Sequence, residues 1–312
     1  MINPILASSA RRRMRSWRTV IILTLYGALM LAFAVTSSLS VLGRSTMTIG
    51  GMRAGIDYYI YAVALQFVLL LLVAPGMTAN SIAGERERQT LDLILVTHTG
   101  SFRIAVGKLL ESFGFLVLVL LSSFPMLCVV LLFGGITLAQ VLTVLLFMSV
   151  SALGALSVGL FISAVFKRTA AATVVSYLAI FAIGIGTLVP MALDNETLMK
   201  YMNSPDMLNS LSADALFALT PKLLLFNPGI GLLSLMADQT GLLDRTFQML
   251  PSGYMYYQFL EKLDFGLIAW INMGAVFAAS MILTFFSALL IRPRIGRVRG
   301  RGSRKAAKGL AA

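Results

Sequence analysis

Residues 84–97, between two long apolar stretches, contain a cluster of acidic and basic side chains that begins with four consecutive charges. If these residues form a helix, Glu85 neighbours Arg88 one turn later, and Arg88 neighbours Asp92. The apolar residues that share another face of the same helix are Leu91, Ile94 and Leu95. The pattern predicts a short amphipathic helix, which we call the charged segment.

The residues needed for catalysis, metal binding or proton transfer do not occur at the spacings that those chemistries require. His98 is the only histidine, and the sequence has no HExxH motif, no pair of catalytic carboxylates and no Cys/His cluster. Gly107-Lys108 matches only the end of a phosphate-binding loop, because Phe102 replaces a glycine and Leu109 replaces the serine or threonine of that loop. We therefore expect this chain to hold no ATP site, no metal site and no catalytic residue.

The composition excludes an ordinary soluble protein. Of the 312 residues, 58% are hydrophobic and 12% are charged, against about 45–50% and about 25% in soluble domains. The mean hydropathy is +0.87. The single cysteine, Cys128, leaves no internal disulfide. These values predict a membrane protein with several spans.

Five runs without Asp, Glu, Lys or Arg are each at least 24 residues long, whereas a membrane-spanning helix needs about 20 apolar residues. The longest run supplies two spans, with a turn at Gly134-Gly135. Because the runs are continuously apolar, we expect helices and not barrel strands. The sequence thus predicts an all-α membrane domain over residues 19–291, with six spans at residues 19–42, 58–80, 109–133, 138–166, 169–193 and 266–291.

The basic residues gather on one side of this six-span arrangement. Of the 25 lysines and arginines, 19 lie in the two ends, the connection after span two and the turn between spans four and five. The positive-inside rule places that side in the cytoplasm. Residues 1–18 are then a basic cytoplasmic arm, 292–312 a basic cytoplasmic tail, and 194–265 an external loop. We expect the basic ends to contact lipid and not nucleic acid.

Three features leave alternatives open. The charged segment is an anchor along the inner membrane surface or a docking surface for a partner, with its charges toward the cytoplasm. Residues 223–237 are uncharged but too short to span the membrane, so they form an interfacial or a re-entrant segment. In span four, Ser151, Ala155 and Gly159 recur every four residues, which suits close helix approach between subunits or within one chain.

The charged segment and its surroundings resemble the permease subunits of ABC-2 type transporters. The similarity is carried by the run Gly84-Glu85-Arg86-Glu87-Arg88-Gln89-Thr90-Leu91-Asp92-Leu93-Ile94-Leu95-Val96-Thr97, followed by Gly107-Lys108-Leu109-Leu110. Weaker similarities are the six-span layout, Gly134-Gly135, Phe166-Lys167-Arg168-Thr169 and Asn227-Pro228. The sequence departs from the family at His98-Thr99, where a turn containing proline is expected.

The resemblance implies that the charged segment is a coupling helix between spans two and three, which docks in a groove on a separate ATPase subunit. The docking residues that it implies are Glu85, Arg86, Glu87, Arg88, Thr90, Leu91 and Asp92. A second permease subunit, in a homodimer or a heterodimer, is also implied. ATP and Mg would then be held by the ATPase, while this chain is not an enzyme and binds no cofactor.

The function expected from this resemblance is outward movement of a hydrophobic or amphiphilic substrate across a bacterial cell membrane. The alternatives are a membrane assembly or regulatory protein that has the same fold without transport, and a polytopic membrane enzyme.

Overall fold

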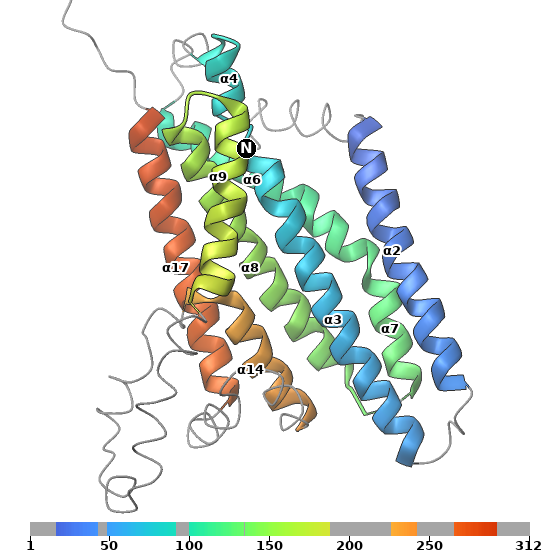
Figure 1. The fold of residues 1–312 in the computed structure, drawn as a ribbon. Helices are drawn as coiled ribbons and strands as arrows, with labels where there is room; N and C mark the ends of the chain where they lie inside the picture. Colours follow the sequence, from blue (N-terminus) through green and yellow to red (C-terminus); the bar gives the residue numbers. More distant parts are fainter. Residues whose placement is uncertain are drawn as a thin grey trace, which may run out of the picture.

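The computed structural model describes residues 17–42, 49–91, 100–133, 135–187, 226–241 and 265–291. Within these ranges the chain is a bundle of helices and contains no strand (Figure 1), which confirms the predicted all-α class for this part. The elements are α2 (Trp17–Leu42), α3 (Ile49–Thr78), α4 (Ala83–Glu87), α6 (Ser101–Ser122), α7 (Phe124–Phe133), α8 (Leu138–Val165), α9 (Thr169–Phe181), the π-helix η1 (Ala182–Gly186), α14 (Pro228–Thr240) and α17 (Phe265–Ile291).

Five helical stretches in the described ranges are long and apolar enough to cross a membrane, and they correspond to predicted spans two to six. They are Gly55–Glu87, Ser101–Leu131, Leu138–Val165, Thr169–Gly186 and Gly266–Ile291. The first predicted span coincides with α2, whose apolar stretch, Val20–Thr36, is shorter. The count of six spans therefore stays a prediction. The basic tail and most of the basic arm and the external loop lie outside the described residues.

Helix α8 lies at the centre of the bundle, where it packs against α3, α6, α9 and α17 (Figure 1). Buried residues occur on every side of α8, as is typical of a helix surrounded by others. A capping box fixes its start, because Thr137 Oγ1 accepts a hydrogen bond from Gln140 N and Gln140 Oε1 accepts one from Thr137 N. Gly135, with φ of 91°, lies in the turn before α8 that the paired glycines predicted.

Helices α3 and α8 approach each other closely at Gly159. A Cβ atom at this position would clash with Thr78 Oγ1 and would lie 3.4 Å from Pro75 O. Ser151 and Ala155, which belong to the same stripe of small residues, are also buried inside the chain. Of the two alternatives for this stripe, the structure therefore supports packing within one chain.

The third span is a broken helix, whereas the sequence predicted one continuous helix over residues 109–133. Helix α6 ends at Ser122 and α7 begins at Phe124, with Pro125 in the first turn of α7. Proline has no backbone N–H group, so it cannot donate the hydrogen bond that would continue the preceding helix. At the break, Gln66 Nε2 of α3 donates a 2.6 Å hydrogen bond to Ser123 Oγ.

Helix α14 is a short helix buried against α17 and α8. Its start is capped by Asn227 Oδ1, which accepts from Gly229 N at 2.8 Å, and Gly241, with φ of 62°, follows its end. A Cβ atom at Gly231 would clash with Asn272 of α17, so glycine allows the close approach of these two helices. Residues 228–237 therefore pack inside the bundle, while the choice between an interfacial and a re-entrant segment stays open.

Several helices extend beyond the uncharged runs that predicted them. Helix α3 begins at Ile49 and includes Arg53 and Asp57, and α6 begins at Ser101 and includes Arg103 and Lys108. The helices therefore begin before the spans predicted at residues 58 and 109, and the bounds of these spans in the membrane stay a prediction. Charged residues end the apolar core of a span, but they are good helix formers and leave the helix itself intact.

Candidate functional site

The charged segment begins as a short helix and then turns. Helix α4 covers only Ala83–Glu87, Gln89 has φ of 57°, and Leu91 is buried after the turn. The helix predicted through Thr97 is therefore confirmed at residues 83–87 and interrupted at residues 88–90. Asp92 and the rest of the segment lie outside the described residues.

Helix α4 is fixed to the end of α8. The backbone N–H groups of Ile82 and Ala83 both donate to Ser163 Oγ, at 3.0 and 2.9 Å. Arg86 Nη1 donates to Ala164 O at 3.0 Å and to Phe166 O at 3.3 Å. A cation at these carbonyls also complements the negative end of the α8 dipole.

Glu87 connects the same segment to the start of α9. Its Oε2 atom accepts a 3.1 Å hydrogen bond from Thr169 N, the first amide of that helix. The residue before α9, Arg168, makes no side-chain cap of its own. Glu87 thus caps α9 from a distant part of the sequence, and its negative charge suits a helix N-terminus.

Glu85 pairs with α6 and not, as predicted, with Arg88 on its own helix. Its Oε1 atom lies 2.5 Å from Lys108 Nζ. The other carboxylate oxygen is buried and has no hydrogen-bond partner among the described residues. Beside this pair is a polar hollow of about 320 Å³, which Arg88 and Thr90 also line.

The side chains of Glu85, Arg86 and Glu87 contact α6, α8 and α9, although Glu87 is exposed, as are Arg88 and Thr90. That these charges face the cytoplasm stays a prediction. Sequence reasoning missed Ser163 and Lys108. Lys108 carried a signal, because the resemblance included Gly107-Lys108, but no pattern distinguished Ser163 from the other serines of span four.

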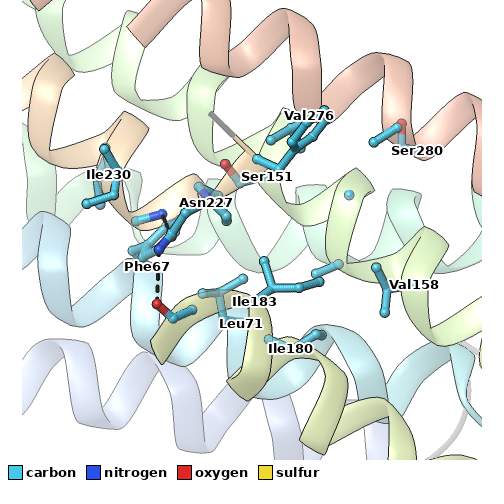
Figure 2. A pocket seen from close by; sticks show the side chains of 18 of the residues that line it. Phe67, Leu71, Ser151, Val158, Ile180, Ile183, Asn227, Ile230, Val276 and Ser280 are labelled. Carbon is cyan, nitrogen blue, oxygen red and sulfur yellow. Dashed lines mark hydrogen bonds between the residues drawn. The ribbon is translucent and has the colours of Figure 1, made fainter. Parts of the chain in front are cut away.

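An apolar cavity of about 470 Å³ lies deeper in the bundle, between α3, α8, α9, η1, α14 and α17. Figure 2 shows side chains from these elements around it, among them Phe67, Val158 and Val276. The hydroxyls of Ser157 and Ser280, which also line the cavity, donate to carbonyls of their own helices, each at 2.7 Å.

Asn227 joins three of the elements that form the cavity wall. Its Nδ2 atom donates to Gly184 O of η1 at 2.9 Å and to Thr187 Oγ1 at 2.7 Å, and Asn272 Nδ2 of α17 donates to Asn227 O at 3.0 Å. The π-helix η1 departs from the regular hydrogen-bond ladder, and such turns are frequent at functional sites. Asn227 thus links η1 and α17 to the start of α14.

Two helices reach both the charged segment and the cavity. Helix α8 contacts the segment at Ser163 and Ala164 and lines the cavity from Ser151 to Val158. Helix α9 contacts the segment at Thr169, and its C-terminal end, with η1, forms another wall of the cavity. A displacement of the segment would therefore move two walls of the cavity.

The comparison with protein families gives one extended match. Residues 4–291 match the family described as ABC-2 family transporter protein. Among curated proteins, none matches the chain.

Proposed function

Because the chain belongs to the ABC-2 family of transporters, we propose that it is the membrane-spanning permease subunit of an ATP-driven exporter. A separate ATPase subunit binds ATP and Mg and hydrolyses the nucleotide. A second permease subunit completes the transport path. The complex lies in a bacterial cell membrane with both permease termini in the cytoplasm, and it moves a hydrophobic or amphiphilic substrate outward.

The observation that carries this proposal is the attachment of the charged segment to three helices. Ser163, Arg86 and Glu87 hold α4 against the end of α8 and the start of α9, and Glu85 holds it against α6. A force applied to α4 by a partner reaches all three helices, because packed elements move between discrete arrangements and do not deform continuously. This arrangement supports a role in force transmission.

The docking contact itself lies on the outer side of the segment in this proposal. Arg88 and Thr90 are exposed and line the adjacent hollow. An exposed arginine side chain can form charge-assisted hydrogen bonds with a carboxylate of the ATPase, which supports a contact at this position. The predicted docking set is thereby divided, with Arg86 and Glu87 fastening the segment to the bundle.

The transport step follows from this division of roles. ATP binding closes two ATPase subunits on each other, and each subunit displaces one charged segment. The displaced segment carries the ends of α8 and α9 with it, and the cavity walls shift. The apolar lining of the cavity supports a substrate with a substantial hydrophobic part.

The test is purification of the tagged full-length chain from its native membrane in mild detergent, followed by an assay of MgATP hydrolysis and identification of the bound subunits by mass spectrometry. We expect an ATPase subunit with a phosphate-binding loop to co-purify. An Arg88→Glu variant should retain at least about tenfold less of it, because one contact to a charged group contributes about 1.5–3 kcal/mol.

The matched control is the double variant Arg299→Ala and Arg301→Ala, which removes basic residues from the tail. This variant should keep the ATPase subunit. If wild-type chain carries no ATPase subunit, the proposed function is wrong. If the tail variant releases the subunit and Arg88→Glu retains it, the docking surface is elsewhere.

A further inference from the structure

Three long helices, α3, α8 and α17, each present one face to the cavity. Each of these helices lines it with residues at positions i, i+3, i+4 and i+7, which lie on one face of a helix. The lining residues are Ala64, Phe67, Val68 and Leu71 on α3, Ser151, Gly154, Ala155 and Val158 on α8, and Val276, Ala279, Ser280 and Leu283 on α17. Seven residues of helix rise about 10 Å, so the cavity extends over two turns of three helices.

Three of the four polar side chains that line the cavity form hydrogen bonds within the chain, and the fourth is Ser151. Ser157 and Ser280 donate to backbone carbonyls of their own helices. Asn227 uses Nδ2 for Gly184 O and Thr187 Oγ1, and Oδ1 for Gly229 N. Water in a cavity needs two to four polar partners, whereas cavities with apolar walls stay dry and bind apolar ligands.

From this shape and lining we propose that the cavity binds a single hydrocarbon chain aligned with the helices. Its volume of about 470 Å³ falls within the roughly 300–1,000 Å³ of small-molecule sites. The cavity is partly open, because Val68 and Phe226, which line it, are exposed, so an apolar ligand can reach it. The chain belongs either to a membrane phospholipid or to a single-chain amphiphile that is the cargo. Only the second source rests on the proposed function.

Two positions allow the cavity to be filled without a clash in the bundle. Ala279 lines the cavity and is only partly buried, whereas its neighbour Ala278 is exposed and does not line it. Gly184 also lines the cavity, and a Cβ atom there would meet no atom within 4 Å. Gly186, in the same π-helix, is exposed and is not part of the lining. Each cavity variant therefore has a matched control on the same element.

The experiment is photolabelling of the full-length chain in phosphatidylcholine vesicles with two probes. The first is phosphatidylcholine with a diazirine in one acyl chain, and the second is lysophosphatidylcholine with the same diazirine chain. We expect labelling at lining residues such as Val158, Ile183 and Val276, and competition by the unlabelled form of the same lipid. Ala279→Phe should lower this labelling about tenfold, equivalent to about 1.4 kcal/mol, while Ala278→Phe should not.

The two probes distinguish the sources of the chain. Labelling of the lining by the phospholipid identifies a membrane lipid, and labelling by the lysolipid alone identifies a single-chain amphiphile. Gly184→Leu against Gly186→Leu repeats the test if Ala279→Phe does not elute as a folded protein. The proposal is wrong if neither probe labels the lining, or if cavity and control variants lower the labelling equally. Because no ATPase takes part in this measurement, its failure is separate from failure of the proposed transport.

Discussion

At the scale of single residues, the charged side chains from Glu85 to Arg88 differ in what they bind. Arg86 and Glu87 are bound to the facing ends of α8 and α9, which are joined by the turn at residues 166–168. Arg88 makes no such contact with the part of the chain that the structure describes, and it is exposed beside the polar hollow. The alternating charges therefore have two roles: Arg86 and Glu87 attach the segment to the bundle, and Arg88 places a positive charge at its surface.

Replacement of Arg86 should lower the stability of the bundle. In Arg86→Met the carbonyls of Ala164 and Phe166 lose a charged donor, which corresponds to about 1.5–3 kcal/mol. The matched change Arg88→Met should stay within about 0.5 kcal/mol, as is usual for exposed positions. Thermal unfolding of both variants in detergent measures the difference. Equal midpoints for the two variants would show that Arg86 does not fasten α4 to α8.

At the scale of elements, the places of the helices could be predicted from the sequence better than their ends and breaks. The uncharged runs predicted the apolar stretches, because a membrane span excludes charge over a fixed length. The break at Ser123 has a local signal in Pro125, although the apolar run continues through it. The π-turn at Ala182–Gly186 has no local signal that we identified, and its carbonyl at Gly184 is bound by Asn227 from a distant segment.

For the candidate site too, the contacts between residues far apart in the sequence could not be predicted. Its position in the sequence was predictable from the clustered charges, but the partners of those charges were not. Ser163, Ala164 and Thr169 lie about 80 residues further along the chain, and only the packed bundle brings them to α4. Local periodicity carries no information about contacts at that separation. The cavity has the same origin, since six elements form it.

The close approach of α3 and α8 should depend on glycine at position 159. In Gly159→Ala the new methyl group meets Thr78 and Pro75, so the helices must separate. Overpacking of this kind destabilises by about 1–3 kcal/mol. Gly114→Ala on α6 is the control, because a Cβ atom there meets nothing within 4 Å and alanine favours a helix by about 1 kcal/mol over glycine. The thermal midpoint in detergent should fall for the first variant and hold or rise for the second.

At the scale of the whole molecule, the charged segment and the cavity occupy different levels of one bundle. Helices α8 and α9 extend between them, so both belong to one mechanical unit (Figure 1). In the proposed transporter the segment faces the ATPase in the cytoplasm. The charge asymmetry of the sequence predicts the same orientation, since 19 of 25 basic residues fall on that side.

This orientation can be tested by cysteine labelling in a Cys128→Ser background, where no other thiol is present. Arg88→Cys and Lys305→Cys should react with a membrane-impermeant maleimide only after the cells are opened, because both are predicted to be cytoplasmic. Ser210→Cys, in the predicted external loop, should react in intact cells and serves as the positive control. Opening the cells should therefore raise the labelling of the first two variants and leave the third unchanged.

Labelling of Arg88→Cys from outside would place the segment away from any cytoplasmic ATPase and would contradict both the topology and the proposed coupling. Labelling of Lys305→Cys alone from outside would contradict the even number of spans predicted between Arg88 and the tail, since the charged segment and the tail would then lie on opposite sides of the membrane.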